Sequence, residues 1–428
     1  MLERYFEFSK RKTTLRTELL AGLTTFMTMS YIMFVNPAIL SEAGMDKSAL
    51  VVTTCLIAAI SSVMMGLIGK VPIALAPGMG LNAFFAYTLV LTQEISWQIA
   101  LGMVFWAGVL FLLLSLVGGR ERLMRAIPSS LVAAIGAGIG FFLLFIGFKN
   151  LGLVTADPAT LVTLGEFTDE VLIGLFGLFL TILLMVKKVR GALFIGIISS
   201  TLLAIITSKV SMPASWFSFD FDISPVAFQL DIFGALSLAY IGPIFALMFV
   251  DMFDTVGTMV ACAHEAKLVK KDGRIERARE MLAVDAFATL LSGVLGTSPT
   301  TSYVESASGI AAGGRSGFTA VVTGSLFLLG LLFIPLIGIV PPYATAPALI
   351  VVGILMLAQI QRINFQKYDD AFPAVLTIAT MVFTFQISTG IAIGFLSWGL
   401  IRIFLLRTNE VHWIVYLVMV LSLLSLIM

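Results

Sequence analysis

MFVDMFDTVGTMVA (residues 248–261) and TSPTTSYVESASGIAAGG (residues 297–314) are the two stretches that decide the fold of this chain. Together with the apolar run between them, they place four carboxylates in membrane-like sequence, namely Asp251, Asp254, Asp285 and Glu305. A charged side chain at the centre of a bilayer costs about 2.5–3.5 kcal/mol even on the most lenient scale. The four carboxylates therefore predict a polar site inside a bundle of membrane-spanning helices.

The composition is typical of a polytopic membrane protein. Of the 428 residues, 59% are hydrophobic and 12% are charged, whereas a soluble domain has about 25% charged residues. This balance excludes a large soluble enzyme, and no basic tail or motif indicates binding to nucleic acid. The sequence also has no nucleophile elbow, no HExxH motif and only two histidines, far apart. We therefore expect neither an enzyme nor a metal site, and no bound cofactor.

Fourteen apolar runs have the length of a membrane span. Their bounds are near residues 18–40, 49–69, 72–91, 96–118, 127–148, 171–187, 190–208, 235–262, 280–296, 297–314, 316–339, 343–360, 371–388 and 389–406. A last apolar run, residues 411–428, is short for a span. It either crosses as a fifteenth helix or lies along the membrane surface.

Lys and Arg are distributed unevenly over the predicted loops. With the N-terminus inside, 23 of the 26 Lys and Arg lie in inside segments, and only Lys47, Lys149 and Lys209 lie outside. Cytoplasmic loops of membrane proteins carry such an excess of positive charge. We therefore expect a multi-pass protein of the cell (inner) membrane, surrounded by the lipid bilayer, with its N-terminus in the cytoplasm.

Two predicted spans are interrupted. Fourteen spans divide into two units of seven, and an odd-numbered unit repeated in tandem must be inverted in the membrane. The third span contains APGMGLNAFF (residues 76–85), and the tenth begins with TSPTTSYVESASG (residues 297–309). Both are broken by Pro and Gly, and they occupy corresponding positions of the two halves. Such pairs of interrupted spans mark the binding sites of secondary transporters.

The spacing of the carboxylates indicates two kinds of role. Asp251 and Asp254 are three residues apart and share one helical face with Thr255 and Thr258. Two carboxylates this close cannot both ionise easily away from water, so one of them is suited to carry a proton. The alternative is an Asp whose partner fixes helix packing, which applies more strongly to Asp251 and Asp285.

Glu305 follows the break in the tenth span, and small residues beside it let a ligand or another helix approach closely. Carboxylates on two different helices, Asp254 and Glu305, suit the recognition of a planar polar ligand through its ring N–H or exocyclic NH₂ groups. The Asp251 and Asp254 pair also suggests an intramembrane aspartyl protease, but that enzyme needs facing helices, and no GxGD sequence is present.

At these residues the chain resembles a known family. The stretches at residues 21–40, 76–88, 251–258 and 296–317 look like those of the AzgA-like purine permeases. That group belongs to the nucleobase–cation symporter superfamily, which includes the uracil and xanthine permeases. The resemblance implies an all-α polytopic fold of 14 transmembrane segments in two inverted seven-segment repeats. Short extended stretches in segments 3 and 10 would cross near the substrate.

The resemblance also implies two domains. Segments 1–4 and 8–11, at residues 1–126 and 235–340, would form a core domain. Segments 5–7 and 12–14, at residues 127–234 and 341–428, would form a gate domain, through which the protein would form a homodimer.

Site residues follow from the same motifs. Asp254 takes the place of a substrate-binding Glu, and Glu305 takes the place of a second Glu or Gln. Phe84 or Phe85 would stack on the base. The neighbouring residues expected to contact substrate are Asn82 and Ser306. The candidates for proton coupling are Asp254, Glu305, Asp251 and Asp285. Related permeases have a Gln-His pair where this chain has Thr24-Thr25, so a coupling role of that His does not transfer.

The expected function is import of purine nucleobases (adenine, guanine and/or hypoxanthine) by proton symport, as the core moves against the gate. Sodium is the alternative coupling ion, and a facilitator without coupling is the alternative mechanism. A different substrate class, an anion, is the alternative for the same inverted-repeat fold. Anion transporters of this fold keep positive or neutral groups between the ends of the third and tenth helices, because helix N-termini favour anions. Glu305 beside the break therefore counts against an anion.

Overall fold

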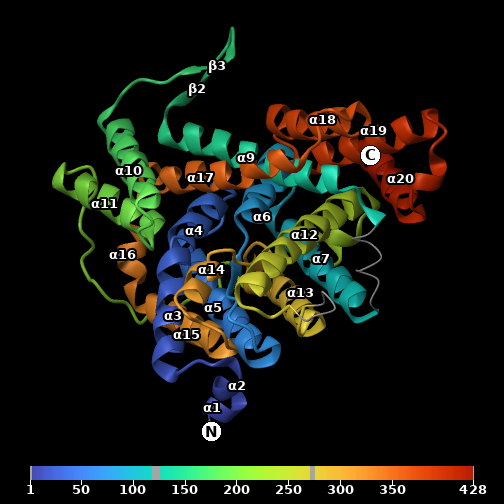
Figure 1. Cartoon of the computed structure of the whole chain (residues 1–428). Coiled ribbons are helices and arrows are strands. Elements are labelled where there is room, and N and C mark those ends of the chain that lie inside the picture. Colours follow the sequence, from blue (N-terminus) through green and yellow to red (C-terminus); the bar gives the residue numbers. More distant parts are fainter. Residues whose placement is uncertain (1, 118–125, 270–274, 428) are drawn as a thin grey trace.

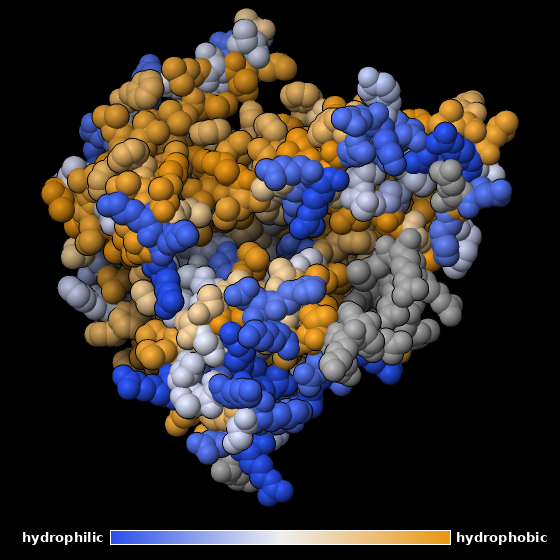
Figure 2. Space-filling model, in the orientation of Figure 1, coloured by the Kyte–Doolittle hydropathy of each residue, from blue (hydrophilic) through white to orange (hydrophobic). Residues whose placement is uncertain are grey.

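The computed structural model describes residues 2–117, 126–269 and 275–427. Its helices form two layers (Figure 1). We use core and gate as labels of position alone, for the layer that contains the N-terminal helices and for the layer that packs across it. In the space-filling view, apolar side chains cover much of the gate, hydrophilic side chains gather over the core, and the surface between the layers is hollowed (Figure 2).

The core is built from two sets of elements, one from each half of the chain. The first set is α3 (Leu15–Met29), α4 (Ile32–Glu42), α5 (Lys47–Met64), η1 (Met65–Gly69), β1 (Leu75–Pro77), α6 (Met79–Ala83), η2 (Phe84–Thr92) and α7 (Trp97–Val117). The second set is α12 (Ile241–Glu265), α13 (Ala278–Leu295), β4 (Thr300–Ser302), α14 (Ser306–Ala311), α15 (Gly317–Gly330), η5 (Leu331–Phe333) and α16 (Ile334–Gly338). Each set thus has one short strand followed by a short helix.

The gate also comes from both halves of the chain. Its helices are α9 (Ser129–Leu151), α10 (Asp169–Val186), α11 (Ala192–Ile206), α17 (Pro342–Leu357), α18 (Tyr368–Thr384), α19 (Ile387–Phe404) and α20 (Trp413–Ile427). The remaining elements are α1 (Leu2–Tyr5), α2 (Phe8–Arg11), the hairpin of β2 (Val154–Asp157) and β3 (Leu161–Leu164), and the 3₁₀ turns η3 (Gly234–Leu236), η4 (Leu238–Tyr240), η6 (Ala358–Arg362) and η7 (Thr408–Glu410).

Nine helices in the described part of the chain are long and apolar enough to cross a membrane. They fall on nine of the predicted spans and confirm a multi-span helical membrane protein. The other five predicted spans are 72–91, 190–208, 280–296, 297–314 and 371–388. Two of these contain β1 and β4, two form the shorter helices α11 and α18, and α13 holds three charged residues. The number of fourteen crossings therefore stays a prediction.

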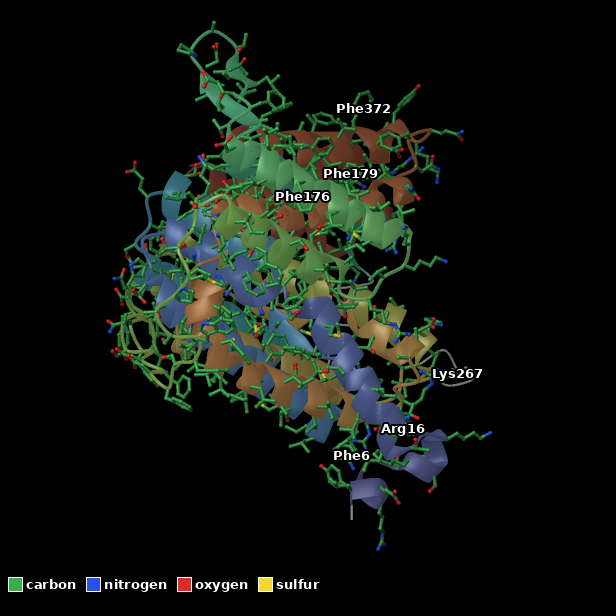
Figure 3. The ribbon with its side chains drawn as sticks, turned by 90° about the vertical axis from the view of Figure 1, so that its left-hand side faces the viewer. Phe6, Arg16, Phe176, Phe179, Lys267 and Phe372 are labelled. Carbon is green, nitrogen blue, oxygen red and sulfur yellow. The ribbon has the colours of Figure 1, made fainter. Side chains whose placement is uncertain are left out.

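Basic residues from separate segments meet at one end of the molecule, which we call the basic end. There Lys70 lies 4.2 Å from the ring centroid of Tyr5, and Arg277 donates a hydrogen bond to the carbonyl of Ile68. Arg16 and Lys267 project on the same side (Figure 3). Some of the predicted inside residues lie outside the described residues, namely Arg120, Arg122, Arg125, Lys270, Lys271 and Arg274.

The far surface of the gate is apolar. Phe176 and Phe179 on α10 and Phe372 on α18 are exposed and point away from the core (Figure 3). Exposed aromatic side chains of this kind match a lipid environment. The C-terminal run forms α20, which packs antiparallel to α19 within this layer, because Met419 contacts Gly399 and Leu421 lies near Ile391.

Core and gate are hydrogen-bonded at the end opposite the basic end. Asn150 on α9 donates to Glu42 Oε1 at the end of α4, over 3.0 Å, and Tyr87 Oη donates to the same oxygen over 2.8 Å. Thr88 donates to the carbonyl of Phe385, between α18 and α19, over 3.0 Å. We call the Glu42, Tyr87 and Asn150 group the latch. It closes one end of the boundary between the two layers.

Candidate substrate site

The two interrupted spans cross at the centre of the core. β1 and β4 pair as antiparallel strands, with Leu75 opposite Ser302 and Pro77 opposite Thr300. Two further backbone hydrogen bonds extend this pairing, from Gly78 N to Pro299 O and from Tyr303 N to Ala74 O. Each half of the chain thus supplies one strand, so the crossing joins the two repeats.

A hydroxyl from the preceding helix supports the first residue of each strand. Ser62 on α5 donates to the carbonyl of Leu75 over 2.9 Å and accepts from its N–H over 2.9 Å. Thr289 on α13 donates to the carbonyl of Thr300 over 2.9 Å. The same contact at the same place in both sets of core elements indicates an internal structural repeat.

Glu305 lies directly before α14, and the residue is partly exposed. Its Oε1 accepts a hydrogen bond of 2.5 Å from the hydroxyl of Tyr31, which is buried at the junction of α3 and α4. Among the described residues, Tyr31 is the one side chain that donates to this carboxylate. Tyr31 therefore holds one oxygen of Glu305, and the residue keeps some exposed surface.

Asp254 on α12 is likewise partly exposed, in contrast to its helical neighbour Asp251. Its Oδ2 is 3.5 Å from the hydroxyl of Thr301 on β4, the outer limit for a hydrogen bond. Asp254 thus lies beside β4, and Glu305 follows the same strand by three residues. The structure thus brings two carboxylates from different helices to one side of the strand crossing, and both have surface left to bind a ligand.

Asp251 and Asp285 are fully buried, and each is bonded to a threonine of the other's helix. Thr289 on α13 donates to Asp251 Oδ2 over 2.6 Å, and Thr255 on α12 donates to Asp285 Oδ2 over 2.7 Å. Each helix has the Asp four residues before the Thr, so antiparallel packing gives two reciprocal bonds. Thr255 also lies 2.9 Å from Thr301. We call Asp251, Thr255, Asp285 and Thr289 the Asp–Thr brace.

Asn82 on α6 belongs to a second buried polar cluster. Its amide nitrogen donates to Asn36 Oδ1 over 3.3 Å, while its own Oδ1 has no partner among the described residues. Asn36 on α4 donates to Thr54 over 2.8 Å and to Thr297 over 3.0 Å. The cluster ties helices of the first half to the residues that lead into β4.

The other residues predicted to contact substrate are buried in this conformation. Phe84 and Phe85 are both 0% exposed, so neither ring faces open space in this conformation. Ser306 is also buried, and its hydroxyl accepts a hydrogen bond from the N–H of Ala74 over 3.0 Å. In this conformation Ser306 therefore holds Ala74, the residue that directly precedes β1.

Sequence reasoning did not single out Tyr31 or Asn36. Both lie in the 21–40 motif, but an isolated polar residue in an apolar run gives no hint of its partner. For Tyr31 the available signal was general, since a buried tyrosine usually finds a hydrogen-bond partner for its hydroxyl. Its partner, Glu305, is far away in sequence and follows from the three-dimensional fold alone.

A helical membrane bundle whose two halves cross as broken spans, with carboxylates at the crossing, defines a membrane transporter. Comparison with known proteins agrees. The model of the permease family matches residues 16–393, and this chain belongs to that family.

Two relatives cover nearly the whole chain. Adenine permease AdeP of Escherichia coli (strain K12) is 42% identical and covers 100% of this chain and 96% of its own. Guanine/hypoxanthine permease PbuG of Bacillus subtilis (strain 168) is 43% identical, with 97% of each covered. The transmembrane domain of the cyanobacterial bicarbonate transporter BicA has the same fold, with a TM-score of 0.68 at 16% identity over 87% of this chain and 97% of that one.

Proposed function

We propose that this protein imports purine nucleobases, namely adenine, guanine or hypoxanthine, across the cell membrane. The single observation that supports this most is the pair of partly exposed carboxylates, Asp254 and Glu305, beside the strand crossing. Purine bases present ring N–H and exocyclic NH₂ donors, and carboxylate oxygens are acceptors for both. Relatives named as adenine and guanine/hypoxanthine permeases cover almost the entire chain, which supports the same substrate class.

The charge of the site disfavours an anion as substrate. The likeness to a bicarbonate transporter concerns the fold, at 16% identity. In the described part of the chain, no Lys or Arg forms an ion pair with Asp254 or Glu305. An anion would therefore approach two negative groups without a compensating positive side chain.

We further infer that transport uses alternating access and proton symport. The fourteen proposed crossings would divide into a core, which holds the site, and a gate, which moves against it. The N-terminus and the basic end would face the cytoplasm. The four membrane carboxylates, Asp251, Asp254, Asp285 and Glu305, are the groups that can take up a proton. The apolar far surface of the gate would face lipid or a second copy of the chain.

Competition for uptake tests the substrate class. Radiolabelled hypoxanthine uptake is measured in cells without purine permeases of their own, with and without an excess of adenine, guanine, xanthine, uracil, sulfate or bicarbonate. We expect uptake above the vector control and inhibition by at least one of adenine and guanine. Absence of uptake with the protein in the membrane, or inhibition by the anions alone, would contradict the proposal.

A further inference from the structure

The first long apolar segment is interrupted at Tyr31. α3 ends at Met29 and α4 begins at Ile32, and across this junction the N–H of Met33 donates to the carbonyl of Ser30 over 3.1 Å. A bond to the third preceding residue tightens the turn relative to an α-helix. The tightening lies in the middle of this segment, and the side chain of Tyr31 reaches from it to the strand crossing.

Tyr31 is more deeply buried than Glu305, the residue to which it donates. The tyrosine is 1% exposed, whereas Glu305 is partly exposed, so the phenol approaches the carboxylate from the protein interior. The ring of Tyr31 lies beside that of Tyr303, with 6.4 Å between the ring centroids. The hydroxyl of Tyr303 donates to the carbonyl of Pro77 on β1 over 2.5 Å. The Tyr31 ring therefore packs against a ring that is anchored to the strand crossing.

A hydrogen bond to one carboxylate oxygen determines the direction in which the other oxygen can accept a hydrogen bond. A phenol donates one hydrogen, which Tyr31 gives to Glu305 Oε1. The bond fixes the rotation of the carboxylate and leaves Oε2 free to accept from a ligand. A glutamate without such a partner loses more side-chain entropy when it binds, because long side chains have many rotamers.

We propose that Tyr31 is a positioning residue for substrate recognition, which holds Oε1 of Glu305 so that Oε2 is presented to an N–H group of the base. This inference rests on the proposed function, in which Glu305 binds a purine. It adds a residue of the first half of the chain to a site whose carboxylates both come from the second half. The polar group that recognises the substrate thus depends on a contact between the two halves.

The test compares purine binding by four purified proteins in detergent: wild type, Tyr31→Phe, Glu305→Asp and the double variant. Phe removes the hydroxyl alone, and Asp withdraws the carboxylate from Tyr31 by one methylene. We expect Tyr31→Phe to weaken binding about tenfold or more in the wild-type background. In the Glu305→Asp background the same change should alter binding less than about twofold, because the bond is already lost.

An equal factor in both backgrounds, or wild-type affinity in Tyr31→Phe, would overturn the inference. Tyr5→Phe, which loses a phenol bond to the carbonyl of Leu67 at the basic end, is the matched control and should bind like the wild type. If Glu305→Asp binds too weakly to compare, the ligand-free structure of Tyr31→Phe decides. Glu305 should leave its present rotamer there, and an unchanged rotamer overturns the inference.

The outcomes also separate this inference from the proposed function. If the wild type binds no purine, the proposed function fails. If the wild type binds purine and Glu305→Gln does not, while Tyr31→Phe binds normally, only the role of Tyr31 fails. Melting temperatures of the ligand-free proteins show whether each variant is folded, so that weak binding is not confused with unfolding.

Discussion

Thr289 on α13 donates its hydroxyl hydrogen to Asp251 on α12 over 2.6 Å, where neither side chain has any exposed surface. The same hydroxyl lies 2.9 Å from the carbonyl of Thr300 on β4, so two acceptors share its one hydrogen. One threonine thus satisfies a buried carboxylate and the strand that crosses at the site. The brace makes the position of β4 depend on how α12 lies relative to α13.

Thr289→Val should therefore destabilise the protein. Valine keeps the shape of threonine but removes the hydroxyl that Asp251 and the carbonyl of Thr300 share, so Asp251 loses this donor. We expect the free energy of unfolding to fall by about 1.5–3 kcal/mol, as for a lost bond to a charged group. Thermal or denaturant unfolding in detergent measures the change. The control is Thr201→Val, which loses a buried hydroxyl that donates to the carbonyl of Ile197 on its own helix. Equal losses in the two variants would contradict a special role of the brace.

The carboxylates at the crossing should be essential for uptake. Asp254→Asn and Glu305→Gln keep the size of each side chain but replace an acceptor oxygen with a donor. We expect each to lower hypoxanthine uptake at least 10- to 100-fold, since a hydrogen bond to a charged group is worth about 1.5–3 kcal/mol. Immunoblots of the membrane fraction report protein levels. Asp222→Asn, in an exposed segment, serves as the control, and wild-type uptake by both site variants would refute their assignment.

Breaking the latch should open the end of the protein opposite the basic end. Asn150→Ala removes the donor from α9 to Glu42 and should favour conformations in which core and gate separate there. A cysteine at Ser41, which lines a cavity of about 90 Å³ beside the latch, reports the change. We expect a membrane-impermeant maleimide to label this cysteine several-fold faster in Asn150→Ala, because the cavity opens to solvent. The native cysteines, Cys55 and Cys262, are buried and should contribute little background labelling. An unchanged labelling rate would show that the latch does not hold this end closed.

Proton coupling predicts that uptake depends on the membrane gradient. In proteoliposomes, an inward proton gradient should drive accumulation of purine above the outside concentration, and a protonophore should abolish it. A sodium gradient of the same size is the matched condition. Accumulation with sodium alone would identify the other coupling ion, and equilibration without accumulation in either gradient would indicate a facilitator.

The sequence predicts the general architecture because burial in a membrane imposes strong rules on composition. Runs of apolar residues and the distribution of Lys and Arg depend on the bilayer, so they can be recognised without knowledge of contacts. The nine long apolar helices and the match to the permease family confirm the polytopic class. Pro77 and Pro299 likewise mark where the two broken spans lose regular helix, since proline lacks the backbone donor.

The detailed site could not be predicted in the same way. Asp254 and Glu305 were recognisable because charges are costly in a membrane, and the structure places both beside β4. Tyr31 and Asn36 carry no charge, and their roles arise from contacts with Glu305 and Thr297 that no local pattern encodes. The depth of Phe84 was also beyond sequence, because an apolar ring has the same local pattern whether it faces a cavity or the core.

The pairing of β1 with β4 also sets the order in which the protein can be completed. The ribosome makes β1 long before β4. Until β4 is made, the N–H of Gly78 lacks its acceptor, the carbonyl of Pro299, and the carbonyl of Ala74 lacks its donor, the N–H of Tyr303. Unpaired backbone groups are costly inside a bilayer. A chain arrested before residue 303 would expose an open strand edge in the membrane. We expect such a chain to be recognised and degraded as an unfinished product.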